Sequence, residues 1–348
     1  MKKAAVAIVL FCVISMGLIC YLSAGKVITI TDVAQDEVHE QETVKEKVSQ
    51  GTTKSLTFQL GDADTSYLRV PLPEGCKAEN IVIENHYMDK QLWLMIGNAE
   101  ENFYYDNVIS GNREMVEHGT FDVTAEGIKL NFQLTGIYEC CTILENNNLY
   151  ISFLAPKEMY DKIVVIDPAC GGLDAGHMSA GLLEKNINLQ IARKLKEKLD
   201  GSDIKAYYTR MDDVNPSEEE RVALGNETKA DMYIRIQVCS SEDTSVYGTE
   251  TVYNGHYFIP GFGSVELADH LEREVVTSIK GKALGLIEAG ASDYTIKNAT
   301  VPAAAIGVGY ISNAQEVVLL GKEEYIDKIA TGIYEAIIAA YEKGENNS

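Results

Sequence analysis

The sequence contains few basic residues for its length. Its 348 residues include 30 lysines and arginines against 52 aspartates and glutamates, so the formal net charge is -22. Because phosphate binding needs clustered lysine and arginine, this composition argues against a nucleic-acid partner. Hydrophobic residues are not scarce: they make up 46% of the chain, which excludes a disordered protein and, at this length, favours two globular units.

Charged residues are missing from one stretch near the N-terminus. Ala4 to Leu22 is an uncharged run of nineteen residues that follows two lysines, and this length is just enough for a helix to span a bilayer. We interpret residues 1–25 as a signal anchor, which places the chain in the cell membrane with its C-terminal domains outside the cell. The alternative is a secreted protein whose signal peptide is cleaved near Ser23 and Ala24.

Only five cysteines lie outside this uncharged run, namely Cys76, Cys140, Cys141, Cys170 and Cys239. Five is an odd number, so at least one of them stays free even in an oxidising habitat. In the first part of the chain we expect one of the neighbours Cys140 and Cys141 to be the bridge partner of Cys76. The alternative is five reduced thiols in an anaerobic organism.

Apolar residues are scarce again between residues 26 and 53, where glutamate, glutamine, lysine and aspartate dominate. This composition cannot bury a face, so it predicts an extended acidic linker. Residues 54–158 differ, because segments such as QLWLMIG and GIKLNFQL are rich in β-branched and aromatic residues. They predict a β-rich module that resembles a sandwich. It has no residues at catalytic spacing, and we expect it to bind or position a ligand.

Strand-like and helix-like segments alternate in residues 159–343. KIVVID and MYIRIQV are typical of strands, whereas EKNINLQIARKLKEKLD has apolar residues at every fourth position from Ile187 to Leu199. This alternation predicts an α/β fold in which helices flank a sheet. Sites in such folds lie beyond the carboxyl ends of the strands, and we therefore expect Cys170, Gln237 and Tyr310 to lie there.

Six segments in this part of the chain carry a family resemblance, and in order they are IVVIDPACGG, GLLEKNINL, YYTRMDD, ERVALGNETKADMYIRIQVCS, GTETVY and VPAAAIGVGYISN. Together they resemble the zinc-dependent N-acetylmuramoyl-L-alanine amidases, which cut peptidoglycan between the glycan lactyl group and the stem peptide. The resemblance implies an amidase-like sheet flanked by helices, here preceded by a β-sandwich-like domain. That β-rich module is similar, much more weakly, to the N-terminal β-domain that some of these amidases use for wall targeting.

The resemblance also implies a zinc ion held by His, Glu and His, with a water in the open position and a second Glu as general base. Of these four family positions the chain keeps Glu184. Cys170 replaces the first histidine, in Asp-Pro-Gly-His-Gly-Gly, and Gln237 replaces the second, in Ser-Ile-His-Ala-Asn. Counting from Pro302 places Gly307 at the general-base position, and glycine cannot accept a proton. Because a neutral amide is a poor zinc ligand, we expect no catalytic residue and no bound zinc.

A substitute metal site is a weaker alternative. His177 lies in the loop after Cys170, and Cys239 lies two residues beyond Gln237, so Cys170, Glu184, His177 and Cys239 would hold a metal only if the fold gathered them. Glu184 is equally favoured by the helix dipole without a metal, because it begins a helix. A disulfide between Cys170 and Cys239 is a further hypothesis, and its alternative is a Cys170 that fills a disused cavity.

Several positions that are structural in the family are retained, among them Arg210 and Arg221. We expect these arginines to help hold a stem peptide in the groove beyond the sheet, unless they pair only with a carboxylate such as Asp231. The leading interpretation is a catalytically inactive, membrane-tethered amidase-fold protein that binds peptidoglycan or a wall-enzyme partner. The alternatives are an active amidase with an altered metal site and a purely structural component of a cell-envelope complex.

Overall fold

The structure is a computed structural model that describes residues 27–34, 53–60, 66–256 and 261–345. The described residues form two compact units, and in the sequence one unit passes into the other between Leu154 and Ala155. The predicted signal anchor lies outside the described residues. Within the described ranges, no helix is both long enough and apolar enough to cross a membrane.

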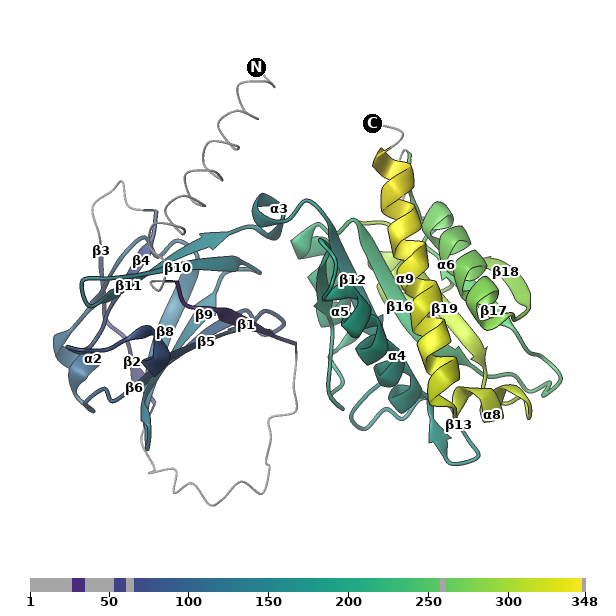
Figure 1. The fold of residues 1–348 in the computed structure, drawn as a ribbon, viewed down its shortest axis with the longest axis horizontal. Coiled ribbons are helices and arrows are strands. Elements are labelled where there is room, and N and C mark those ends of the chain that lie inside the picture. The colour runs from purple at the N-terminus through teal and green to yellow at the C-terminus, as the bar shows by residue number, and fades with distance from the viewer. Residues whose placement is uncertain (1–26, 35–52, 61–65, 257–260, 346–348) are drawn as a thin grey trace. The chain divides into compact units, whose positions relative to one another are not determined.

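The first unit consists almost entirely of strands (Figure 1). They are β1 (Ile30–Val33), β2 (Lys54–Ser55), β3 (Phe58–Leu60), β4 (Leu68–Pro71), β5 (Ile81–His86), β6 (Gln91–Gly97), β7 (Ile109–Gly111), β8 (Val116–Thr124), β9 (Gly127–Leu134), β10 (Glu139–Glu145) and β11 (Asn148–Leu154), with the short helices η1 (Ala78–Asn80) and α2 (Phe103–Asp106). One sheet has the order β1-β5-β6-β9-β8-β2 and the other β10-β11-β4-β7-β3.

Both sheets of this unit bury side chains in one core. Alternate residues of β5, β6 and β9, such as Ile83, Leu94 and Leu130, are fully buried, and Val70 and Leu149 of the other sheet belong to the same cluster. The two-residue period of these strands explains the arrangement, because it turns every second side chain inward and leaves the others on the outer face.

The predicted acidic linker is wrong at its beginning. Residues 30–33 form β1, which pairs in parallel with β5, and Ile28 is buried in the core. The backbone N–H of Ile28 donates to the hydroxyl of Thr142, which in turn donates to the Ile28 carbonyl. A contact between residues so far apart in the sequence compensates for the polar composition around β1. Residues 35–52 lie outside the described part of the chain.

The second unit alternates strands with helices, and this confirms the predicted α/β fold. Its elements are α3 (Pro156–Met159), β12 (Ile163–Pro168), β13 (Met178–Ser179), β14 (Leu182–Leu183), α4 (Glu184–Leu199), β15 (Lys205–Tyr208), α5 (Glu218–Thr228), β16 (Met232–Cys239), β17 (Thr249–Tyr253), α6 (Ser264–Ile279), β18 (Ala283–Glu288), α7 (Tyr294–Asn298), β19 (Ala303–Tyr310), α8 (Glu316–Leu320) and α9 (Glu323–Glu345). Helices α4, α9 and α6 pack side by side (Figure 1), α4 against β12 and β16, and α6 against β17 and β19.

The central sheet of this unit has the order β15-β12-β16-β19-β17-β18. Its strands β12, β16 and β19 are neighbours and run parallel, so their carboxyl ends meet at one edge of the sheet. The predicted stripe of α4 faces this sheet, since Ile187, Ile191, Leu195 and Leu199 are all buried. The stripe therefore fixes the start of α4, and with it Glu184, beside the ends of the strands.

Candidate functional site at the carboxyl edge of the sheet

The four positions to which the resemblance assigns zinc ligands and a general base, 170, 184, 237 and 307, lie at this edge. Gln237 of β16 and Gly307 of β19 are directly paired in the sheet. Glu184 begins α4, and its carboxylate reaches the backbone of Val238. Cys170 follows β12, and a Cβ placed on Gly176 would contact both the Cys170 sulfur and the Glu184 carboxylate. The fold thus brings these four positions to one edge of the sheet.

The carboxylate of Glu184 is occupied by hydrogen-bond donors of the protein itself. Its Oε1 accepts from the N–H of Val238 at 3.0 Å and from the amide of Asn188 at 3.4 Å. Its Oε2 accepts from the N–H of His177 at 2.9 Å. The side chain is only 4% exposed, and a buried carboxylate needs such donors because burial otherwise disfavours its charge. Glu184 therefore ties the loop after β12 to strand β16.

The side chains at positions 170 and 237 are poor metal ligands. Burial, followed by the nearby negative charges of Glu184 and Asp174, raises the pKa of the Cys170 thiol to about 12. The thiolate, not the thiol, is the metal-binding form, so Cys170 stays neutral near pH 7. Gln237 contributes a neutral amide, which zinc does not favour.

The space beside Gly307 is filled by two neighbouring side chains. A Cβ at this position would collide with the Cys239 sulfur and would lie 3.4 Å from Cγ of Glu250, the residue paired with Gly307 in strand β17. The Cys239 thiol donates to Oε1 of Glu250 at 3.4 Å, and the Tyr310 hydroxyl donates to Oε2 at 2.7 Å. Burial, followed by the charge of Glu250, raises the pKa of Cys239, so this thiol is also neutral.

Glu250 is a carboxylate at the site that the sequence reasoning did not single out. It lies in the segment GTETVY, whose composition predicts a strand and does not single out a functional residue. Its position follows from the antiparallel pairing of β17 with β19, which sets Glu250 against Gly307. A strand-like segment predicts neither which strand lies beside it nor the register of the pairing. The sequence therefore offers only a weak signal for Glu250, namely a polar residue within a strand that belongs to the same sheet.

A cluster of buried, charged side chains surrounds Asp167, near the carboxyl end of strand β12. The Asp167 carboxylate is fully buried and accepts from Thr209 at 2.7 Å, Arg221 at 2.5 Å, Tyr233 at 2.8 Å and Arg235 at 2.8 Å. Burial alone would raise the pKa of Asp167, but the two guanidinium groups and the two hydroxyl donors lower it below its usual range. The carboxylate is therefore ionised and paired, as a buried charge must be.

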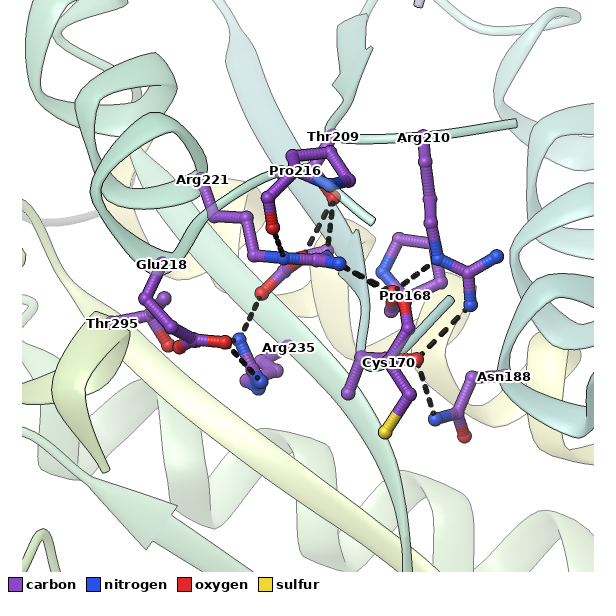
Figure 2. Close-up of polar contacts among 12 residues, drawn as sticks. Pro168, Cys170, Asn188, Thr209, Arg210, Pro216, Glu218, Arg221, Arg235 and Thr295 are labelled. Carbon is purple, nitrogen blue, oxygen red and sulfur yellow. Dashed lines mark hydrogen bonds and ion pairs between the residues drawn. The ribbon is translucent and has the colours of Figure 1, made fainter. Parts of the chain in front are cut away.

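Arg210 and Arg221 bind the loop after β12 instead of lining an open groove (Figure 2). Both are fully buried. Arg210 donates to the carbonyls of Pro168 and Ala169, and Arg221 donates to those of Pro168 and Cys170. This geometry does not match the expected role of the two arginines in a binding groove, because their guanidinium N–H groups donate to backbone carbonyls of the protein itself.

The carboxylate partner expected for the arginines is also different. Arg221 pairs with Asp167, whereas Asp231 pairs with Lys157 at 2.7 Å and accepts from the N–H of Ile163. Arg235, which stands beside Gln237 on β16, bridges Asp167 to Glu218 of α5. Arg221, Arg235 and Asp231 therefore all have partners of opposite charge within the protein.

The substitute metal site is not assembled by the fold. Among the residues that the structure describes, no group of three His, Cys, Asp or Glu side chains could hold a metal ion. The His177 side chain is exposed, and its contact with Glu184 is made by the backbone N–H. The sulfur of Cys239 is directed at Glu250. The residues present at the edge therefore do not fit a zinc ion.

No disulfide joins the cysteines that the structure describes. Cys76, Cys140, Cys141, Cys170 and Cys239 are all free thiols, so the expected bridge of Cys76 to Cys140 or Cys141 is wrong. The hypothesised bridge between Cys170 and Cys239 is thus absent, and the two sulfur atoms have different neighbours, Gly176 and Glu184 for the first, Gly307 and Glu250 for the second.

Comparison with known proteins identifies similar chains. A family model described as N-acetylmuramoyl-L-alanine amidase matches residues 164–339. The uncharacterized protein YqiI of Bacillus subtilis is 33% identical over 190 residues, which cover 54% of this chain and 89% of that protein. The germination-specific N-acetylmuramoyl-L-alanine amidase of the same organism is 32% identical over 200 residues, covering 53% and 82%. A solved N-acetylmuramoyl-L-alanine amidase from Clostridium difficile 630 is 30% identical with a TM-score of 0.49, covering 52% of this chain and 97% of that one.

Proposed function

The chain belongs to the N-acetylmuramoyl-L-alanine amidase family, and we propose that it is a member that binds peptidoglycan without cleaving it. One observation carries the proposal. The position at which the family has its general base is Gly307, and the adjoining space is filled by Cys239 and Glu250. A missing general base alone lowers the rate of such a reaction by about a hundredfold to ten-thousandfold.

The metal half of the reaction is weakened independently. Glu184 has both carboxylate oxygens engaged by donors of the protein, and Cys170 is a neutral thiol. Zinc chemistry in this family needs ligands that hold the ion while leaving one position open for water. The residues at this edge instead complete one another's hydrogen bonds, which supports a site that keeps its shape with no ion.

Groups suited to binding remain at the edge. Gln237 and Glu250 are partly exposed and carry hydrogen-bonding atoms that a stem peptide, with its amides and free amino groups, would match. Leu173 lies in the loop after β12 and Met178 begins β13, and they are 106% and 67% exposed. Exposed apolar residues beside polar groups are typical of binding surfaces. They also favour the second candidate function, in which a wall enzyme docks here.

We further propose that residues 1–25 hold the protein in the membrane, with both units outside the cell. Fractionation of cells that produce the full chain tests this part, because a cleaved signal peptide would release the protein into the medium and an uncleaved anchor would retain it with the membranes.

The catalytic question is answered by three measurements on the purified full chain. We expect no stoichiometric zinc by elemental analysis, no release of stem peptide from purified sacculi, and heat of binding when a soluble muropeptide is titrated in. An active amidase with an altered metal site would instead release stem peptide and lose that activity to a chelator. Absence of heat at millimolar muropeptide, with the protein folded, would leave only the partner-docking function.

A further inference from the structure

Glu250 belongs to a row of four residues that crosses four neighbouring strands of the second unit. The pairing sets Gln237 of β16 beside Gly307 of β19 and Gly307 beside Glu250 of β17. Glu250 in turn lies beside Gly285 of β18. Paired residues of adjacent strands project from the same face of a sheet. The row therefore presents two polar side chains on one face, each of them next to a glycine.

The space next to Glu250 is filled on one side and open on the other. On the side of β19, a Cβ placed on Gly307 would collide with the Cys239 sulfur. On the side of β18, a Cβ placed on Gly285 would meet no atom within 4 Å. The Glu250 side chain is itself partly exposed. A ligand can therefore reach its carboxylate from the side of β18.

The carboxylate of Glu250 has neutral partners only, within the residues that the structure describes. Its Oε1 accepts from the Cys239 thiol at 3.4 Å, and its Oε2 accepts from the Tyr310 hydroxyl at 2.7 Å. Arg235, which precedes Gln237 by two residues on β16, is paired with other carboxylates. Each carboxylate oxygen can accept a second hydrogen bond. Glu250 is thus held in place with a negative charge that no cation of the protein balances.

Two further carboxylates make the surroundings of Glu250 more negative. Burial raises the pKa of the Cys239 thiol, and the charges of Glu250, Glu184 and Glu316 raise it as well, so all three carboxylates act on that sulfur. Glu184 and Glu316 are buried, and their oxygens accept from backbone N–H groups. They are therefore out of reach of a ligand, which leaves Glu250 as the contact. A cation gains attraction from all three, whereas an anion is repelled.

An exposed apolar side chain lies next to the open space. Ile287 stands two residues beyond Gly285 on β18 and is paired with Val252 of β17. By the two-residue period of a strand it shares a face with Glu250 and Gly285, and it is 47% exposed. A carboxylate beside an open glycine and an exposed aliphatic residue matches a primary ammonium at the end of a short aliphatic chain.

We propose that Glu250 determines the specificity of the carboxyl edge by binding the free side-chain ammonium of the diamino acid in a stem peptide. This inference rests on the proposed function, which supplies the peptide, and it adds which group of the peptide is selected. The carboxylates of a stem peptide are repelled at this position, so the ammonium is the group that faces Glu250. The hydrogen bond from Tyr310 fixes the carboxylate before the ligand arrives, which lowers the ordering cost of binding.

Two forms of one ligand test this assignment. A soluble muropeptide with a free amino group on its diamino acid is compared with the same muropeptide after N-acetylation, which removes the positive charge. Calorimetry with the purified full chain should show about tenfold weaker binding of the acetylated form. Added salt should reduce this difference, because Glu250 is partly exposed and its attraction for the ammonium is screened. Equal affinities of the parent protein for the two forms would overturn the inference.

The variant Glu250→Gln separates a ligand contact from a structural role. It keeps the size of the side chain and one oxygen that accepts from Tyr310, but it removes the charge. It should bind the free-amine muropeptide about tenfold more weakly than the parent does and should no longer distinguish the two forms. Glu288→Gln is the matched control, since Glu288 is an exposed glutamate of β18, and it should keep the full difference. Unfolding in urea verifies that both variants are folded. A tenfold difference that persists in Glu250→Gln would refute the assignment.

Failure of this inference is distinguishable from failure of the proposed function. Heat of equal size and affinity with both forms of the muropeptide would overturn the role of Glu250 and leave peptidoglycan binding standing. No heat with either form would overturn the proposed function and the inference with it. Cadaverine, a free diamine without a peptide, should bind far more weakly than the free-amine muropeptide. Cadaverine binding as tight as that of the muropeptide would assign the site to a free amine and overturn the stem-peptide assignment.

Discussion

Replacement of Arg221 by methionine tests whether this arginine supports the fold or serves a ligand. The guanidinium is fully buried, pairs with Asp167 at 2.5 Å and donates to the carbonyls of Pro168, Cys170 and Pro216. Loss of one partner from a buried ion pair costs about 3–5 kcal/mol. Because Arg235 still pairs with Asp167 in the variant, we expect the lower end, about 3 kcal/mol.

Two optical signals separate the units in this experiment. The long helices α4, α5, α6 and α9 all belong to the second unit, and Trp93 belongs to the first. Far-ultraviolet circular dichroism in urea therefore reports the unit that contains Arg221, and tryptophan fluorescence reports the other. With a slope of about 2 kcal/mol/M, a loss of about 3 kcal/mol lowers the helical midpoint by about 1.5 M. The fluorescence midpoint should not move.

The matched control is Arg193→Met. Arg193 pairs with Asp212 at 3.2 Å and is half exposed, so its loss should cost less than about 1 kcal/mol. If Arg221→Met moved the helical midpoint no further than Arg193→Met and yet abolished muropeptide binding, the arginine would be a ligand contact. The structural account of the cluster around Asp167 would then be refuted.

Three other changes give separate expectations. Gly307→Glu should show no release of stem peptide, because the zinc ligands are still missing. It should also lower the free energy of unfolding by about 1–3 kcal/mol through its collision with the Cys239 sulfur, and an added Cys239→Ala should recover part of that loss in urea. Glu184→Gln should lower the free energy of unfolding by about 1–3 kcal/mol, because the N–H of His177 or of Val238 then faces an amide donor instead of an oxygen. Elemental analysis that found zinc in the parent protein and none in this variant would contradict the account. The pKa of Asp167 is lowered in the folded state. The ionised Asp167 therefore contributes fully to the free energy of unfolding above the unfolded pKa of about 3.9, and this contribution is lost progressively as the pH falls from there towards the lower pKa of the folded state. The helical midpoint should accordingly fall between pH 6 and pH 3, and less steeply in Arg221→Met; equal slopes would disprove the linkage.

Elements with a strong local pattern could be predicted from the sequence, and elements held by distant contacts could not. The four-residue repeat of α4 predicted both the helix and its buried face. Strand β18 was missed, since its side chains are largely exposed and Gly285 has a φ of 104°. Its backbone is held by Glu272 of α6, which accepts from the N–H groups of Leu284 and Gly285. No local propensity signals a contact of that kind.

The same distinction explains what could be known about the candidate site. Motifs of fixed spacing predicted positions 170, 184, 237 and 307 as the candidate site, because a family motif depends only on the order of residues along the chain. The contacts that these positions make are decided across the chain. Glu184 accepts from Val238, 54 residues away, and Glu250 meets Gly307 through an antiparallel pair. Because these contacts satisfy the buried carboxylate and fill the space at Gly307, a change at one of these two positions alone disturbs an existing contact. We therefore expect no single substitution to give activity, and we expect activity to require Cys170→His, Gln237→His and Gly307→Glu together with a smaller residue at 239.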